Sequence, residues 1–333
     1  MLRFLSTLIV LFVLAIAAAV GAFFWYVTSP LVLKSDPVEF HVAPGSGLRA
    51  AARDIAAAGV GIEPWALVVL GRGLAVDTAI KAGSYEVTAG ITPLDLIRKL
   101  TQGDVTQTDV TFVEGMTLRQ MRDRLDAHPD LRHDSKDLPE QEILAAIGAS
   151  ERAAEGLFFP DTYLFAKQSR DIDVLARAYR AMQKHLAREW ESRAPGLPFD
   201  KPYQALILAS IVEKETGRDQ DRAMIAAVFI NRLRQGMLLQ TDPSVIYGLG
   251  ARFDGNLRKR DLQADGPYNT YTRTGLPPTP IAMPGLASLQ AALRPAQSEA
   301  LYFVARGDGS SQFSRTLDEH NQAVGRYQKG GRR

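Results

Sequence analysis

The sequence predicts an α+β protein with an N-terminal transmembrane helix, a small α/β module and a helix-rich α+β domain whose long loops form a cleft. Three observations lead to this prediction. An uncharged apolar run opens the chain, a strand, glycine turn and helix then recur three times, and helical periodicity dominates the remainder. The 333 residues are enough for two modest domains.

Residues 4–33 carry no charge, and residues 5–27 are almost wholly apolar. About 20 such residues cross a bilayer as a helix. A cleaved signal peptide is the alternative, but its apolar core usually has only about 7–15 residues. The aromatic residues 23–26 suit the far membrane interface, and Arg3 favours an N-terminus inside the cell with the bulk of the chain outside. We therefore predict a retained anchor over residues 1–33.

After a predicted linker over residues 28–37, three short strands each lead through a glycine turn into a helix. The expected helices cover residues 49–58, 93–100 and 117–125. Thr92 and Thr117 stand at N-cap positions, and Pro93 suits the first helical position. Units of this kind are typical of carbohydrate-binding or interaction modules, and equally of a compact packing unit without a ligand. Both alternatives stay open for residues 34–104.

Helical periodicity dominates residues 172–190, where one face is apolar, and a further helix is expected over residues 222–235. The predicted apolar face consists of Leu175, Ala178, Tyr179, Met182 and Leu186. Residues 236–285 are rich in Gly, Pro, Asn and Asp, and so much irregular chain predicts loops that wall a substrate cleft. A short strand over residues 301–305 is expected to close the domain.

The most informative segment is residues 205–217, an apolar helix that ends in Glu213 and Glu215. Gly217 suits a left-handed C-cap. A carboxylate in the last turn faces the negative end of the helix dipole, and apolar surroundings add desolvation. Both effects favour the protonated acid, which a general acid catalyst requires.

The two glutamates point about 200° apart around the helix. Glu215 follows the more apolar stripe, which contains Leu208, Ile211 and Val212, and is therefore the better candidate for a raised pKa. The alternative is that both are ordinary helix-end glutamates paired with nearby cations. Those cations are Lys214, Arg218 and Arg222.

Composition excludes several kinds of site. The net charge of +2 does not favour nucleic acid as a partner, and the basic tail over residues 329–333 is only a local feature. The chain has no cysteine, so disulfides, thiolate nucleophiles and cysteine zinc sites are excluded. The five histidines are scattered without an HExxH pair. We therefore predict no metal and no cofactor.

Polar and aromatic loop residues surround this helix in the sequence, and four runs are specific in combination. They are Ser-Ile-Val-Glu-Lys-Glu-Thr at 210–216, Val-Phe-Ile-Asn-Arg-Leu at 228–233, Leu-Gln-Thr-Asp-Pro-Ser-Val-Ile-Tyr-Gly at 239–248 and Tyr-Asn-Thr-Tyr at 268–271. In these runs the chain closely resembles the YceG-like (MltG) family of endolytic murein transglycosylases. The resemblance covers roughly residues 105–325.

The resemblance implies a membrane anchor, a LysM-like module over residues 34–104 and a YceG-like catalytic domain over residues 105–333. It places the catalytic glutamate at Glu215 and implies cleavage of the β-1,4 bond between N-acetylmuramic acid and N-acetylglucosamine, leaving 1,6-anhydro ends. The implied location is the inner membrane with the catalytic domain in the periplasm, and the implied partners are peptidoglycan strands and peptidoglycan synthases. From polarity and motif membership, sugar orientation is predicted for Asn231, Gln240, Asp242, Ser244, Asn269 and Tyr271.

Two other functions stay open. One is a muramidase, in which Asp242 or Glu213 is a second carboxylate that activates water. The other is a membrane-tethered peptidoglycan-binding scaffold in which Glu215 is structural.

Overall fold

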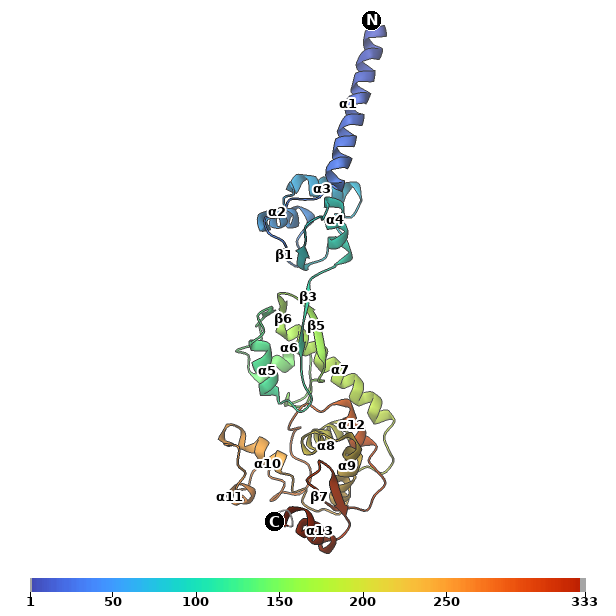
Figure 1. The fold of residues 1–333 in the computed structure, drawn as a ribbon. Helices are drawn as coiled ribbons and strands as arrows, with labels where there is room; N and C mark the ends of the chain where they lie inside the picture. Colours follow the sequence, from blue (N-terminus) through green and yellow to red (C-terminus); the bar gives the residue numbers. More distant parts are fainter. Residues whose placement is uncertain (1, 330–333) are drawn as a thin grey trace. The chain divides into compact units, whose positions relative to one another are not determined.

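The computed structural model describes residues 2–329, so that Met1 and the end of the basic tail, residues 330–333, lie outside the described residues. The mixed α+β class is confirmed. The chain forms two compact units (Figure 1), and each is described by itself. One unit comprises residues 1–108 and 164–169, and the other comprises residues 109–163 and 170–333. The predicted functional division after residues 33 and 104 stays a prediction.

The first unit is a two-stranded sheet covered by helices. Its elements are α1 (Leu2–Thr28), β1 (Val38–Val42), α2 (Leu48–Ala58), α3 (Pro64–Gly73), β2 (Gly83–Val87) and α4 (Pro93–Gln102). β1 and β2 are antiparallel, with Val38 opposite Val87 and Val42 opposite Gly83. The predicted strand–helix pattern is confirmed here, whereas α3 was not predicted. A LysM-like identity for this unit stays a prediction.

The predicted caps are confirmed. Thr92 accepts a hydrogen bond from the backbone N–H of Asp95, and Pro93 is the first residue of α4. Thr117 forms a capping box with Gln120 at the start of α5 (Leu118–Asp126).

α1 contains a 22-residue segment, Thr7–Thr28, that is long and apolar enough to cross a membrane by length and composition, with a mean hydropathy of 2.7. The last turn of α1 and the residues that follow it belong to the core of the first unit, because Val27 and Leu31 are both buried among the residues of that core. The prediction of a linker directly after the helix is therefore wrong for residues 31–34, which are held in place by backbone hydrogen bonds. These are Leu31 N–H to Ile91 C=O (2.8 Å), Gly61 N–H to Val32 C=O (2.8 Å) and Lys34 N–H to Gly59 C=O (2.9 Å).

Gly61 permits this attachment, because a Cβ at this position would collide with the backbone oxygen of Val32. We expect Gly61→Ala to force the two segments apart at a cost of about 1–3 kcal/mol. Hydrogen–deuterium exchange of residues 31–34 in the full-length chain should then become faster. Gly73→Ala is the matched control, since nothing lies within 4 Å of a Cβ there. Equal exchange in both variants would contradict the expected collision.

The second unit is built around a buried helix. Its elements are β3 (Gln107–Thr111, which begins in the first unit), α5, β4 (Leu131–Arg132), α6 (Glu140–Ile147), β5 (Thr162–Ala166, which ends in the first unit), β6 (Ser169–Arg170, which begins in the first unit), α7 (Asp171–Glu191), α8 (Pro202–Glu215), α9 (Asp219–Arg234), α10 (Asp242–Leu249), η1 (Gly250–Arg252), α11 (Lys259–Gln263), α12 (Leu286–Leu293), β7 (Tyr302–Ala305), β8 (Ser311–Ser314), α13 (Leu317–Val324) and η2 (Gly325–Lys329). α8 packs against α7, α9, α10 and α12. Residues 205–212 of α8 are all buried.

The predicted long helix is confirmed as α7. Leu175, Ala178, Met182 and Leu186 are buried on it. Tyr179 is partly buried, and its hydroxyl donates to Glu151 at 2.9 Å. The strand predicted over residues 301–305 is confirmed as β7, which pairs antiparallel with β8.

Two local predictions are wrong. Gly217 is not a left-handed cap: α8 ends at Glu215, and Thr216 leaves it in an extended conformation (φ −149°, ψ 138°). The reason is that α9 begins soon afterwards, and the Thr216 hydroxyl accepts the backbone N–H of Arg218 at 3.0 Å. Residues 236–285 are also not wholly irregular, because α10 and α11 lie within them.

Candidate functional site

Glu215 is the last residue of α8 and is partly buried. Burial raises the pKa of its carboxyl, the negative charge of Asp242 raises it further, and the hydroxyl of Thr241, which donates to Oε1, opposes them. Glu215 has no salt-bridge partner within the part of the chain that the structure describes. A buried carboxyl without a cation favours the protonated form, which is the state that a proton donor needs.

Glu213 has the opposite environment. Its side chain is 7% exposed, and its Oε1 lies 3.7 Å from the guanidinium of Arg222. Its Oε2 accepts the backbone N–H of Gly285 at 3.0 Å. Residues 205–212 of α8 are buried on every side of the helix, so the apolar stripe that leads to Glu215 does not separate the two glutamates. Their partners separate them: Glu213 is a paired structural carboxylate, whereas Glu215 has no cationic partner among the residues that the structure describes.

Glu155 is another carboxyl with a raised pKa. Burial raises it to about 7, and the side chain is almost inaccessible. Its oxygens accept the backbone N–H of Leu118 at 3.0 Å and the hydroxyl of Tyr247 at 3.2 Å. Glu155 thus ties the start of α5 to α10. It does not line the cleft described next, so it is poorly placed to protonate a large substrate.

Glu215 opens into a cleft of about 590 Å³. This volume lies in the range typical of ligand sites. Three of the six predicted sugar-orienting residues, Gln240, Asp242 and Tyr271, line the same cleft. The other lining residues are Arg232, Leu239, Tyr302, Phe303, Val304, Ala305, Leu317, His320, Val324 and Gln328.

The loop beside Glu215 is tightly held. The hydroxyl of Tyr271 donates to Asp242 Oδ1 at 2.5 Å, and the backbone N–H of Gln240 donates to Thr270 C=O at 3.0 Å. Gln240 adopts a left-handed conformation with φ 53°, which is unusual for a residue with a Cβ. Backbone strain of this kind concentrates at functional sites.

The other three predicted residues are turned into the protein. Asn231 donates to the carbonyls of Ser298 (2.8 Å) and Ala300 (3.1 Å). Ser244 is fully buried and donates to Thr241 C=O at 2.9 Å. Asn269 donates to three carbonyls, those of Asp261 (3.2 Å), Leu262 (3.1 Å) and Ala264 (2.6 Å). In these positions they stabilise the loops, and a direct role with substrate stays a prediction.

Sequence reasoning missed two hydroxyls that support the site. Thr241 is 1% exposed, and its hydroxyl donates to Glu215. Its backbone N–H donates to the Thr270 hydroxyl at 3.0 Å, which also lies 2.9 Å from the hydroxyl of Ser244. Both threonines lie inside the quoted motifs, so their neighbours could have pointed to them.

Sequence reasoning also missed a cationic and aromatic wall. The guanidinium of Arg232 donates to Leu301 C=O (2.7 Å) and Leu239 C=O (2.9 Å), and it lies 5.1 Å from the ring centre of Tyr302. The rings of Tyr302 and His320 stack at 5.3 Å. Burial and the Arg232 charge lower the pKa of His320, so this histidine favours the neutral form. Stacked rings beside a polar cleft are suited to the apolar face of a sugar.

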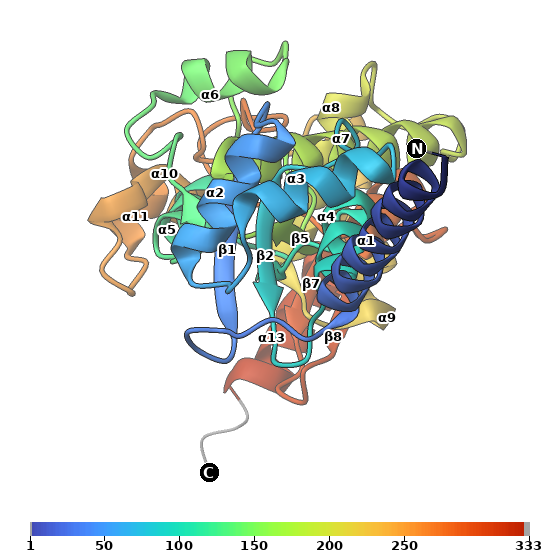
Figure 2. The ribbon, with the colours of Figure 1, turned by 90° about the horizontal axis from the view of Figure 1, so that it is seen from above.

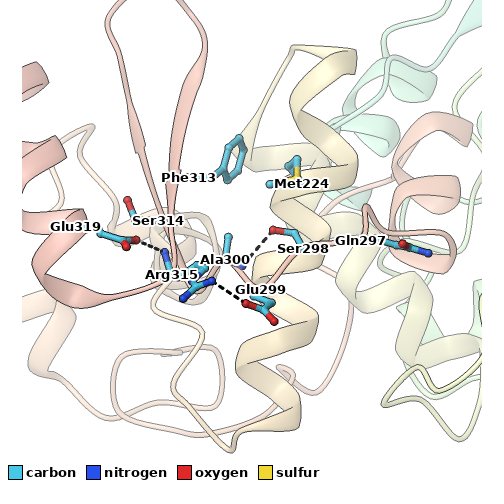
Figure 3. Close-up of a pocket in the computed structure, with 9 residues that line it drawn as sticks. All are labelled: Met224, Gln297, Ser298, Glu299, Ala300, Phe313, Ser314, Arg315 and Glu319. Carbon is cyan, nitrogen blue, oxygen red and sulfur yellow. Dashed lines mark hydrogen bonds and ion pairs between the residues drawn. The ribbon is translucent and has the colours of Figure 1, made fainter.

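A second cavity of about 570 Å³ lies elsewhere in this unit (Figure 3). Figure 3 shows Met224 and Phe313 on one side of it and an ion pair between Glu299 and Arg315, 3.1 Å apart, on the other. Both members of that pair are largely exposed, and none of the predicted site residues lines this cavity. It is therefore the weaker candidate for a catalytic site.

Within the part of the chain that the structure describes, one set of side chains could approach a metal ion: ligand atoms of Asp126, His133 and Asp171 lie within 4.8 Å of one another. Asp171 already accepts hydrogen bonds from the backbone N–H and hydroxyl of Ser135 and from its neighbour Ile172. This pattern explains the buried carboxylate without an ion, and the set does not line the cleft of Glu215.

Known proteins are similar to this chain over most of its length. The model of the YceG-like family matches residues 40–326. An endolytic murein transglycosylase of Bacillus subtilis (strain 168) is 33% identical over 267 residues, which cover 75% of this chain and 74% of that protein. An endolytic murein transglycosylase of Streptococcus pneumoniae serotype 2 (strain D39) is 27% identical over 289 residues, or 75% of this chain and 51% of that longer protein. The crystal structure of a YceG-like protein from Listeria monocytogenes superposes with a TM-score of 0.55 at 29% identity, covering 86% of this chain and 98% of that one.

Proposed function

Because the chain belongs to the YceG-like family, we propose that it is a membrane-anchored endolytic transglycosylase of peptidoglycan. Its proposed substrate is the β-1,4 bond between N-acetylmuramic acid and N-acetylglucosamine within glycan strands. Two relatives carry the name endolytic murein transglycosylase. The observation that carries the proposal is Glu215, a carboxyl in an open cleft with a raised pKa and, within residues 2–329, no cationic partner.

The proposed reaction needs one acid. Glu215 donates its proton to the glycosidic oxygen as the bond to C1 of the muramic acid breaks and positive charge develops on that sugar. The resulting carboxylate accepts the proton of the same sugar's C6 hydroxyl, whose oxygen attacks C1. The products are a free 4-hydroxyl on the departing sugar and a 1,6-anhydro end, and Glu215 is protonated again. Acid–base catalysis of this kind contributes about 10²–10⁴-fold, and the rest comes from holding the C6 hydroxyl against C1.

The neighbours of Glu215 have separate roles in this proposal. Thr241 orients the carboxyl through its hydrogen bond. Asp242, fixed by Tyr271, adds to the burial that raises the pKa of Glu215 and presents a polar edge to the glycan. Tyr302 supplies an aromatic surface on the wall of the same cleft.

Product analysis tests the reaction class. Purified sacculi digested by the full-length chain in detergent should release glycan ends that are lighter by one water molecule than reducing ends. The muramidase alternative has one observation in its favour, because Asp242 lies in the same cleft as Glu215 and could activate water. Reducing ends as the main product would support that alternative and contradict the transglycosylase.

The pH dependence of the rate should respond to two variants in opposite directions. The acid must be protonated, so the rate falls as pH rises through the pKa of Glu215. Thr241→Val removes a hydrogen bond that lowers this pKa, and the falling limb should move to higher pH. Asp242→Asn removes a charge that raises the pKa, and the limb should move to lower pH. Initial rates of muropeptide release across the pH range provide the measurement, and two shifts of the same sign would contradict the assignment.

For location, the proposal places α1 across the cytoplasmic membrane as a single-pass anchor, with the second unit on the periplasmic side. The 22-residue apolar segment supports the anchor, and Arg3, which precedes it in the sequence, supports the orientation. In that position the enzyme would meet glycan strands as synthases at the same membrane extend them, and its cuts would limit their length.

A further inference from the structure

The aromatic residues at the end of α1 face two different environments. Phe23 and Tyr26 pack against the core of the first unit. Phe24 and Trp25 point away from it and are 68% and 72% exposed. The last turns of α1 therefore belong to the folded module on one side and face outward on the other.

This division limits how far the module can lie from a membrane. Residues 5–22, the apolar part of α1 before the module, number 18. At about 1.5 Å per residue they span roughly 27 Å, close to the approximately 30 Å of a bilayer's hydrocarbon core. No spare apolar length separates the bilayer from the module, so the membrane surface must reach the level of residues 23–26.

α3 has a face that no other described residue covers. Trp65, Val69 and Arg72, spaced i, i+4 and i+7, form this α3 face. Trp65 is 63% and Val69 49% exposed, and Arg72 is exposed as well. The opposite side of the helix, which includes Leu67 and Leu70, is buried in the module.

Two observations place α3, which carries this face, next to the end of α1. The backbone N–H of Glu63, at the N-cap of α3, donates to the hydroxyl of Tyr26 at 3.3 Å. Trp65 is only two residues further along the chain. Figure 1 shows α3 on the side of the unit from which α1 emerges, and Figure 2, seen from that side, shows α2 and α3 in front of β1 and β2.

We propose that the α3 face docks on the lipid headgroup region of the bilayer that α1 crosses. Tryptophan is enriched at this depth, and an arginine there can pair with lipid phosphate. The inference rests on the proposed membrane anchor, which brings the bilayer to this face without a separate binding event. The module is thereby seated on the membrane through two contacts, the spanning helix and the α3 face.

Site-directed spin labelling tests the docking, because the chain has no native cysteine. Three single variants of the full-length chain, Leu14→Cys, Val69→Cys and Ala43→Cys, are labelled and placed in nanodiscs of phosphatidylethanolamine and phosphatidylglycerol. Accessibility to oxygen and to a water-soluble nickel complex is then compared at each site. Ala43 is the matched control, because it is also exposed but lies away from α1. It follows Val42 at the end of β1, whereas the chain that joins β1 to α1 enters the strand at the other end, at Val38.

The expected result is a severalfold higher ratio of oxygen to nickel accessibility at Val69 than at Ala43, with the highest ratio at Leu14. A lipid value at Leu14 with equal, water-like values at Val69 and Ala43 would overturn the docking and leave the anchor intact. A water-like value at Leu14 would overturn the anchor itself. Protection of Val69 from both reagents, increasing with protein concentration, would show that a protein covers the face and would also overturn the proposal.

Discussion

Substituting glutamine for Glu215 is expected to slow glycan cleavage by about 10²- to 10⁴-fold while leaving the fold intact. Glutamine has nearly the same shape and can accept the hydrogen bond of Thr241. Because Glu215 has no salt-bridge partner among the described residues, the substitution leaves no cation unpaired. The loss should therefore be confined to proton transfer.

The measurement is the initial rate of muropeptide release from purified sacculi by the full-length chain. Glu299→Gln is the matched control, since that carboxylate lines the other cavity in a largely exposed ion pair with Arg315. Thermal unfolding of both variants should match the parent. If Glu215→Gln releases the same products at the parental rate, the acid lies elsewhere or the protein is a scaffold.

Replacing Arg222 by methionine is expected to destabilise the second unit by about 3–5 kcal/mol, because it removes one member of a buried ion pair. The side chains of Arg222 and Glu213 are only 9% and 7% exposed. Glu114 lies nearby, and burial together with the Glu213 charge raises its pKa. Without the guanidinium, this pair of carboxyls loses the positive charge that opposes their repulsion.

Urea unfolding of the full-length chain measures this cost. Trp25→Phe and Trp65→Phe in the background leave Trp190 as a fluorescence reporter within the second unit. Adding Glu213→Gln to Arg222→Met should recover much of the stability, because the orphaned charge is removed as well. Arg315→Met is the control. Because the ion pair of Arg315 is exposed, this substitution should lower the free energy of unfolding by no more than about 1 kcal/mol. A small loss for Arg222→Met would mean that water reaches Glu213.

Local chemistry made the caps and the long helix predictable. Thr92 and Thr117 bond to backbone groups three residues away, and the apolar face of α7 follows from i, i+3 and i+4 spacing. The end of α8 was not predictable in the same way. Whether a glycine such as Gly217 turns left-handed depends on where the next helix starts, and that is decided by tertiary packing.

The candidate site also has one part that local sequence chemistry predicts and one part that depends on tertiary packing. Glu215, Gln240, Asp242 and Tyr271 could be proposed together because each carries suitable chemistry within a recognisable motif, and they line one cleft. Their position in one cleft does not test what each residue does with substrate, so these roles stay predictions.

The cationic and aromatic wall could not be assembled from the sequence, although Arg232 lies inside the quoted run at 228–233. Arg232, Tyr302 and His320 come from α9, β7 and α13, and no short-range pattern connects them. Arg232 also looks like an ordinary surface residue of a helix end, although its guanidinium is held by buried carbonyls.

The backbone attachment at residues 31–34 has a practical consequence for the design of truncated proteins that lack the apolar helix. A fragment that begins at Lys34 discards the side chains of Val27 and Leu31 from the module's core. It also leaves the N–H of Gly61 and the carbonyl of Ile91 without the partners they have in the intact chain. A stable truncated protein should instead begin within α1, before Phe23. It then retains a few exposed apolar residues, but its first unit is complete.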